Sequence, residues 1–283
     1  LSGEPTSAND VTRIVVEDTE DAQGTEAYRT VYGLNADGRV LRKAVIEDPT
    51  VGTQTVWCES TTLGTSESSP KDIDRVKEAR SPSAHDVDSD ADLTKFLDPL
   101  SGSNDTDTLR SSAGRILVYV YDDYGYRTDT KVKKGSGGTQ YYISATDYGD
   151  GTNVARHLPT VTYRYPTAST SRTSLYREWT SYSYDFWDDD KSQIKTRTTT
   201  HSTVYASKNG SGVATTTKEY FDELGRLRWT KDGEGNVTYY AQNPDTGGVG
   251  YTMVDVDTTY PLPTDITSGS SGKWIAWSGA APD

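Results

Sequence analysis

The sequence YFDELGRLRWTKDGEGNVTYY, residues 220–240, decides the fold because it places aromatic runs around two short polar turns. Asp222 can accept hydrogen bonds from backbone amides two residues later, and Gly225 can adopt the positive φ that such a turn requires. Arg226 then begins a returning strand, and residues 232–236 form a second turn. The stretch therefore predicts successive antiparallel hairpins with aromatic residues at matching ends.

Weaker copies of this pattern occur earlier in the chain. Asp122 and Gly125 stand in YDDYGYR, residues 121–127, which keeps the Tyr-Asp pair and the glycine. Tyr32 is followed by a Gly-containing turn at 35–38, but this copy lacks the early aspartate. The copies are unevenly spaced, so a regular solenoid period is not predicted.

The pattern resembles the YD repeat of Rhs and teneurin-like proteins, which runs aromatic, Asp, two variable residues, Gly-Arg-Leu, a Gly-containing spacer and Thr-x-Tyr. Phe221 stands where that repeat usually has Tyr. The resemblance implies a long β-sheet that spirals into a shell or tube in full-length proteins, with cargo- or partner-binding parts elsewhere. No motif matches the family's self-cleaving core segment or its variable toxin tip, and the resemblance assigns no catalytic residue.

Alternating runs of branched and aromatic residues predict an all-β or nearly all-β fold. We expect successive antiparallel hairpins to form an extended twisted sheet, or a shell- or solenoid-like β module, with a long polar insertion. Within that insertion, residues 71–80 predict a short charged helix flanked by prolines. The main strands are expected at 11–16, 27–34, 39–46, 53–57, 116–121, 161–165, 179–186, 194–205, 215–221, 226–230, 237–241 and 251–256.

Changes in composition predict four regions. An N-terminal hairpin region spans 1–58 and an acidic Ser- and Asp-rich insertion spans 59–112. A YD-like β-repeat region follows at 113–260, and a Gly- and Ser-rich aromatic tail at 261–283. Long connections in compact domains are usually functional or disordered, so the insertion is expected to be a binding excursion or a surface elaboration.

Composition limits the classes of function. Only 33% of the 283 residues are hydrophobic and the net charge is −13, a combination typical of disorder, but 20 Tyr and 6 Trp supply apolar surface. The acidic balance argues against a nucleic-acid partner, because phosphate binding needs a basic surface. Membrane insertion is not expected, because no apolar run is long enough. The single cysteine, Cys58, excludes an internal disulfide and is expected to be a buried apolar side chain.

One acidic cluster has the alternation of a metal site. Carboxylates at every second position could converge on Ca²⁺, which prefers six to eight oxygen ligands. Compared with an EF-hand loop, the cluster has Ala91 in place of the glycine and Leu97 in place of the final acid. A solvated acidic loop is therefore the alternative. The candidate ligands are Asp86, Asp88, Asp90 and Asp92, and no other cofactor is expected.

The histidines and sequons provide weaker signals. His85, His157 and His201 are far apart, lack metal-ligand spacing and are expected to be solvated or hydrogen-bonded. Three Asn-x-Ser/Thr triplets permit glycosylation, although Thr-rich chains often contain this triplet by chance. They begin at Asn104, Asn209 and Asn236.

Tryptophans near turns can stack on sugar rings or contact a partner, with core packing as the alternative. The candidate contacts are Trp187, Trp229, Trp274 and Trp277, and Trp57 and Trp179 also lie near turns. The last two candidates belong to the Gly- and Ser-rich tail and are expected to dock on this chain or on a neighbour.

The sequence favours a non-enzymatic structural module of an extracellular or cell-surface protein. We expect it to present an extended β surface and to associate with copies of itself, or with other segments of a larger polypeptide, into a shell or fibre. A carbohydrate-binding module and a delivery-shell segment of an Rhs-type toxin are the alternatives. A polysaccharide hydrolase is supported only by the abundance of Asp.

Overall fold

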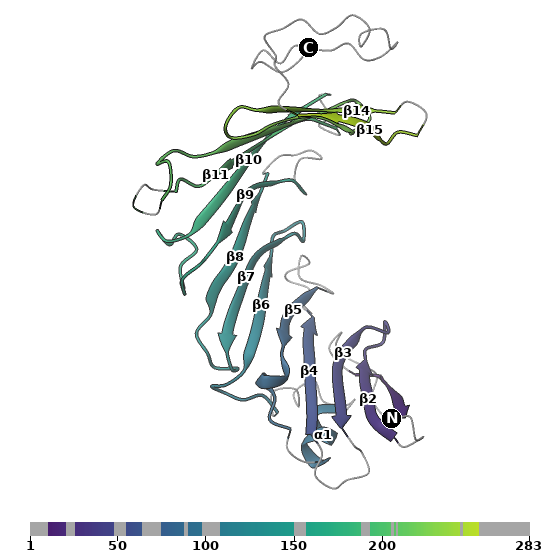
Figure 1. Ribbon diagram of the computed structural model, residues 1–283. Coiled ribbons are helices and arrows are strands. Elements are labelled where there is room, and N and C mark those ends of the chain that lie inside the picture. The colour runs from purple at the N-terminus through teal and green to yellow at the C-terminus, as the bar shows by residue number, and fades with distance from the viewer. Residues whose placement is uncertain are drawn as a thin grey trace, which may run out of the picture. The chain divides into compact units, whose positions relative to one another are not determined.

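The computed structural model describes residues 11–20, 26–47, 55–63, 75–87, 90–97, 108–149, 157–187, 193–204, 207, 209–243 and 246–254. In these ranges, fifteen strands form one sheet in which each strand is hydrogen-bonded to its neighbours in chain order (Figure 1). The pairing is antiparallel from β1 to β8 and from β10 to β15. The nearly all-β fold predicted from the sequence is confirmed.

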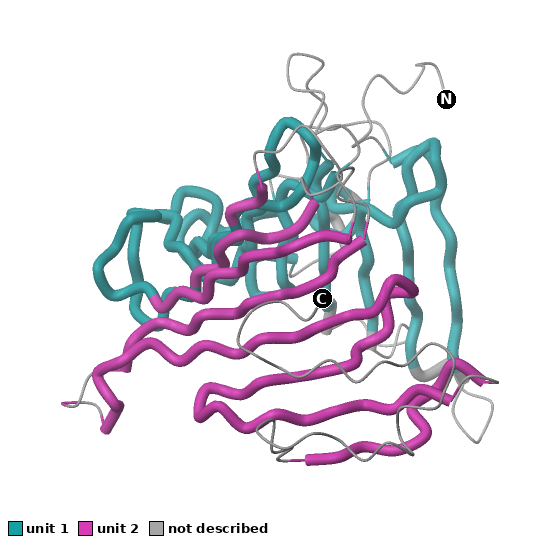
Figure 2. Tube along the Cα trace, turned by 90° about the horizontal axis from the view of Figure 1, so that it is seen from above, with its two compact units in different colours: residues 1–146, 164–177 teal, residues 147–163, 178–283 magenta. Residues whose placement is uncertain are grey.

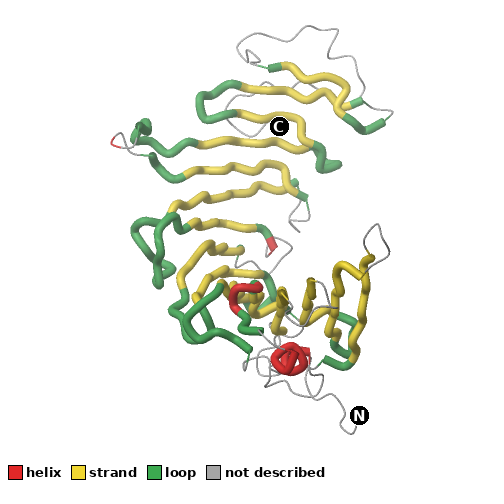
Figure 3. The backbone as a smooth tube through the Cα atoms, turned by 60° about the horizontal axis from the view of Figure 1, so that its bottom comes forward, coloured by secondary structure: helices red, strands yellow, loops and turns green. Residues whose placement is uncertain are grey.

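Helix in the described part of the chain comprises the 3₁₀ turn Pro82–Ala84, α1 at Asp90–Leu97, and single 3₁₀ residues at His157 and Ser207 (Figure 3). The strands in the first half are β1 Arg13–Glu20, β2 Glu26–Leu34, β3 Val40–Glu47, β4 Thr55–Leu63, β5 Val76–Arg80, β6 Arg115–Tyr121, β7 Arg127–Lys134 and β8 Tyr141–Tyr148. The remaining strands are β9 Pro159–Arg164, β10 Glu178–Phe186, β11 Ile194–His201, β12 Thr216–Phe221, β13 Leu227–Lys231, β14 Val237–Gln242 and β15 Val249–Met253.

The chain separates into two compact units, which are coloured differently in Figure 2. The first unit comprises Leu1–Thr146 together with Arg164–Arg177. The second comprises Asp147–Tyr163 together with Glu178–Asp283. The connection between β9 and β10 is therefore part of the first unit, whereas β10 and all of β9 except Arg164 belong to the second.

Four turns in the described ranges share one hydrogen-bonding pattern. In the turn that begins at Asp222, Oδ1 accepts hydrogen bonds from the amides of Leu224 and Arg226 at 3.0 and 2.9 Å. The Asp222 carbonyl accepts another from the amide of Gly225 at 2.8 Å. Gly225 has a φ of 73°, which a side chain would strain. The same bonds are made in the turns that begin at Asn35, Asp122 and Asp232.

In the turn that follows Tyr32, an asparagine does the work of the aspartate. This copy of the repeat lacks the early aspartate, and Asn35 occupies its position. Its Oδ1 accepts hydrogen bonds from the amides of Asp37 and Arg39 at 3.1 and 2.9 Å. An amide oxygen can replace a carboxylate oxygen here because each bond needs only an acceptor.

In the first unit, α1 covers one face of the neighbouring strands. Alternate residues of β2, β3 and β4 point to this face and are buried, among them Val31, Ala44 and Cys58. Phe96 of α1 packs on them and is fully buried. The guanidinium of Arg42, itself 3% exposed, donates a hydrogen bond to the Phe96 carbonyl at 2.7 Å. The helix is thus attached to the sheet by apolar packing and by a buried polar contact.

The helix predicted at 71–80 is wrong for its described part, because Val76–Arg80 is β5. This strand pairs with β4 and β6, so part of the predicted insertion belongs to the sheet. The helix lies instead at Asp90–Leu97, in the acidic segment. Cross-strand pairing overrides the charged composition of β5, which is a tertiary effect that local sequence does not reveal.

In the second unit, the strands β12 to β15 supply their own apolar cluster. Tyr220, Trp229 and Tyr239 are each at most 8% exposed, and Val237 and Ala241 join them. The Trp229 and Tyr239 rings lie 4.5 Å apart between centroids, in a tilted arrangement. These residues face one side because side chains alternate along each strand. Large aromatic side chains thus compensate for the scarcity of aliphatic residues.

Candidate binding surface

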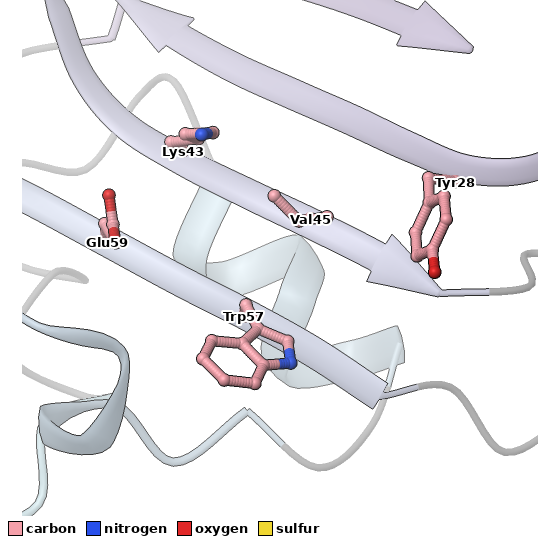
Figure 4. Close-up of a pocket in the computed structure, with 5 residues that line it drawn as sticks. All are labelled: Tyr28, Lys43, Val45, Trp57 and Glu59. Atoms are coloured by element: carbon pink, nitrogen blue, oxygen red, sulfur yellow. The ribbon is translucent and has the colours of Figure 1, made fainter. Parts of the chain in front are cut away.

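A cleft of about 460 Å³ lies on strands β2, β3 and β4, on the face opposite α1. The residues that line it are Tyr28, Lys43, Val45, Trp57 and Glu59 (Figure 4). They face away from the helix because they alternate with Ala44, Ile46 and Cys58, which are buried against it. The cleft is therefore a direct consequence of strand alternation around a one-sided core.

The register of the strands places the cleft residues in pairs. Val45 lies directly opposite Trp57, and Lys43 lies opposite Glu59. Trp57 is 58% exposed and Tyr28 is 47% exposed, unusual values for such large rings. In Figure 4 the two rings lie on either side of Val45, with the charged pair at one end. The surface combines two aromatic faces, an aliphatic floor and one charge of each sign, which suits a ligand with both apolar and hydroxyl-bearing faces.

The hydroxyl of Tyr32, next to the cleft, forms a hydrogen bond with a neighbouring strand. Tyr32 lies opposite Lys43 in the β2–β3 register. Its hydroxyl donates a hydrogen bond to Oε2 of Glu17 at 3.2 Å. Desolvation, followed by this contact with the Glu17 carboxylate, raises the pKa of Tyr32. Tyr32 therefore stays a neutral donor at physiological pH.

The four aspartates of the predicted calcium site are divided between different contacts. Asp86 forms an ion pair with Arg110 at 3.0 Å, and Asp92 pairs with Lys95 within α1 at 3.5 Å. Asp88 and the side chain of Asp90 lie outside the described residues. Among the residues that the structure describes, no group of three or more His, Cys, Asp or Glu is placed to hold a metal ion. Calcium binding stays a prediction.

His85 is buried and hydrogen-bonded, so of the two predicted alternatives the hydrogen-bonded one is confirmed for this histidine and the solvated one is wrong. It is 4% exposed, and its Nε2 lies 3.2 Å from Oγ of Ser60. Its Nδ1 lies 3.4 Å from Oγ1 of Thr108, and its ring meets Phe96 edge to face. His85 thus joins β4 to the segments that cover it. The sequence did not identify these partners because they are distant along the chain.

The predicted tryptophan contacts fall into three situations. Trp229 is 5% exposed within the aromatic cluster, so its ring is a packing surface and is not available to a sugar. Trp187 packs against the same cluster and donates a hydrogen bond from Nε1 to the Phe221 carbonyl at 3.1 Å. Trp274 and Trp277 lie outside the described residues. The exposed ring of Trp57, on β4, offers the better contact.

The sequons differ in their surroundings. Asn236 is exposed, and its Nδ2 donates a hydrogen bond to Oδ2 of Asp232 at 3.0 Å. Asn209 is exposed and has a φ of 61°. Asn104 lies outside the described residues. Glycosylation of Asn236 would replace a hydrogen bond that closes its turn.

Cys58 is 2% exposed, within the cluster beneath α1. Burial raises the pKa of its thiol to about 12. The thiolate is therefore scarce at neutral pH, so the side chain lacks the form that acts as a nucleophile or a metal ligand.

The proteins that resemble this chain are solved structures with low sequence identity to it. No family model and no curated protein matches the sequence. A chain in the crystal structure of TcdB2-TccC3-Cdc42 gives a TM-score of 0.35 at 9% identity, over 86% of this chain and 14% of that chain. A chain of TcdB2-TccC3 without its hypervariable C-terminal region gives 0.34 at 10% identity, over 85% and 14%. A chain of the Photorhabdus luminescens Tc holotoxin pore gives 0.28 at 11% identity, over 83% and 12%.

This chain therefore spans at most 14% of the length of these solved chains. At such TM-scores the likeness assigns neither a family nor an activity. In the described part of the sequence, no helix is long and apolar enough to cross a membrane.

Proposed function

We propose that this chain is a non-enzymatic structural segment of an extracellular or cell-surface polypeptide, in which it forms one stretch of a larger β-sheet assembly. The observation that carries the proposal is the strand order, an open meander in which each strand pairs with the next in sequence. Such a sheet has two edge strands and can be extended at either one without changing its interior.

The repeated turn supports the proposal because it is a local device. Each copy satisfies its own backbone groups through one Asp or Asn side chain and one glycine, as at Asp222 and Gly225. A hairpin built in this way needs no partner distant in sequence, so the same unit can be added repeatedly. The YD-like pattern that contains this turn favours a delivery-shell segment as the particular kind of assembly.

The edge strands provide the test. β1 and β15 end the strand order, and unpaired edges are templates for further strands. Electron cryomicroscopy of the full-length protein should show a neighbouring strand hydrogen-bonded to each of them. Edges that face solvent in the full-length protein would contradict the proposal.

Glycan binding is a second candidate, favoured by the cleft that Trp57 and Tyr28 flank. Exposed aromatic rings stack on the apolar faces of sugars, and the Lys43 and Glu59 pair can bond hydroxyl groups. The cleft also lies away from α1 and from the buried cluster, so its rings do not hold the unit together.

An array of neutral and acidic glycans tests this candidate. The chain should retain at least one glycan, and Trp57→Ala or Tyr28→Ala should abolish retention. Tyr124→Ala is the matched control, because Tyr124 is 56% exposed in the β6–β7 turn, outside the cleft. An array without a bound glycan, or an equal loss in the control, would exclude the cleft as a sugar site.

A further inference from the structure

A second hollow, of about 350 Å³, lies on the sheet of the first unit and adjoins the cleft on β2 to β4. Lys43 and Glu59 line both the cleft and the second hollow, so the two spaces meet at these side chains. The two residues lie opposite each other in the register of β3 and β4. The cleft is therefore one end of a longer groove.

The strand register sets the direction of this groove. Thr61 lies opposite Ala79, and Ala79 lies opposite Leu117, so these three residues of the second hollow form one row across β4, β5 and β6. Thr61 follows Glu59 by two residues along β4 and therefore points to the face of the cleft. The groove thus crosses the strands from β2, which carries Tyr28, to β6. Four strand spacings separate β2 from β6, a span of about 19 Å.

Apolar and charged surfaces alternate along the groove. One end holds the exposed rings of the cleft, and the other end holds the half-buried side chains of Ala79 and Leu117. Lys43 and Glu59 stand between these ends, and the exposed Arg115 lies at the second hollow. Within the described residues, none of the three charged side chains forms an ion pair. Their charges are therefore available to a ligand.

The way the sheet is paired indicates which class of ligand fits. Strands β3, β4 and β5 are hydrogen-bonded to neighbours on both sides, so this face offers side chains and no free backbone groups. A peptide lying across the strands would leave its own amides without backbone partners, which is unfavourable. A sugar chain has no such need, because its hydroxyl groups bond polar side chains and its ring faces stack on aromatic and apolar ones.

We propose that the cleft and the second hollow together bind one linear, neutral oligosaccharide that crosses strands β2 to β6. Its first ring stacks on Trp57, hydroxyl groups of the next ring bond Lys43 and Glu59, and further rings lie over Ala79. A neutral sugar is favoured because the net charge of −13 repels anions. The inference rests on the glycan-binding candidate and adds to it the length and the path of the ligand.

Isothermal titration calorimetry of the full chain tests the length of the ligand. The probes are cello-oligosaccharides and chito-oligosaccharides of two to six sugars. In at least one series, the affinity should rise about tenfold or more between the disaccharide and the tetrasaccharide, and then level off once the groove is filled. Trp57→Ala should abolish binding at every length, because every oligosaccharide uses the aromatic end of the groove.

Two variants test the path of the ligand. Ala79→Leu fills the second hollow, so it should lower the affinity for the longer oligosaccharides to that of the disaccharide and leave the disaccharide unaffected. Arg115→Gln removes a charge from an exposed side chain without altering packing, and should weaken only the longer oligosaccharides. Ala168→Leu is the matched control, because Ala168 is exposed between β9 and β10, outside both hollows, and should bind like the wild type.

The possible outcomes separate this inference from the glycan candidate itself. Equal affinity at every length, with loss of binding in Trp57→Ala, would overturn the second hollow and leave the glycan candidate intact. Length-dependent binding that neither Ala79→Leu nor Arg115→Gln changes would overturn the path across β4 to β6. No binding at any length would overturn the inference and count against the glycan candidate, leaving the surface to a protein segment.

Discussion

The strands of the first unit and those at the end of the second protect one face of their sheet by different means. On β2 to β4 the cover comes from outside the strands, through Phe96 of α1 and the segment that carries His85. On β12 to β15 the buried surface comes mainly from the side chains of the strands, in the cluster around Trp229 and Tyr239, and Trp187 packs against this cluster. A meander can therefore keep one face dry either with an added helix or with large aromatic side chains.

The largest expected effect comes from removing the helical cover. Phe96→Ala should lower the free energy of unfolding by about 3 to 5 kcal/mol, because a fully buried aromatic ring leaves a cavity that the sheet cannot fill. Denaturant unfolding measures the loss, and hydrogen exchange should show faster exchange in α1. Lys95→Ala, an exposed change on the same helix, is the control. A similar loss in both variants would contradict the assignment of the stability to the buried Phe96 ring.

A smaller effect is expected in the aromatic cluster. Trp229→Leu should cost about 2 kcal/mol, because a smaller apolar side chain still fills part of the space next to Tyr239. Thermal unfolding followed by tryptophan fluorescence measures the change. Tyr251→Leu is the control, because Tyr251 is 51% exposed on β15. A larger loss for Trp229→Leu than for Phe96→Ala would reverse the comparison between the two covers.

The two regions also differ in what their sequences reveal. The hairpins of β12 to β14 are evident in residues 220–240, because their core, turns and strands are contiguous. The cover of the first unit is not, because α1 reaches β3 through contacts between Arg42 and Phe96, far apart in the chain. Its acidic start suggested a metal loop, and its eight residues are too few to show a clear helical period.

The candidate site likewise combines a residue that the local sequence indicates with contacts that depend on strand register. Trp57 stood out as an aromatic residue near a turn, but its pairing with Val45 and its closeness to Tyr28 depend on strand register. The burial of Trp229 could not be separated from exposure by local sequence, because both faces of β13 carry large side chains.

Substitutions in the turns should lower the free energy of unfolding by smaller amounts. Asp222→Ala should cost about 1 to 2 kcal/mol, since two backbone amides and the Arg226 side chain lose their acceptor. Desolvation raises the pKa of Asp222, but the hydrogen bonds from Arg226 and Leu224 outweigh it, and the net pKa is lowered. The stabilisation is therefore present above the unfolded pKa, near 3.9, and is lost as the pH falls through the native value.

Melting temperature as a function of pH checks this assignment. The wild-type chain should lose stability as the pH falls from about 5 towards 2, and Asp222→Asn should flatten part of that loss. Asn35, which makes the same backbone bonds without a titratable group, provides the internal reference. An unchanged pH profile in Asp222→Asn would show that other carboxylates govern acid unfolding.

The smallest effect is expected at Asp232, which repeats the Asp222 bonds in an exposed turn. Its Oδ1 accepts from the amides of Glu234 and Asn236 at 3.0 and 2.8 Å. The hydrogen bond from the Asn236 side chain lowers its pKa most, against a smaller opposing effect of desolvation. Because this turn is exposed, water can replace the lost hydrogen bonds. Asp232→Ala should therefore shift the melting temperature less than Asp222→Ala. Equal shifts would mean that the turn geometry alone, without burial or Arg226, determines how much each hairpin contributes.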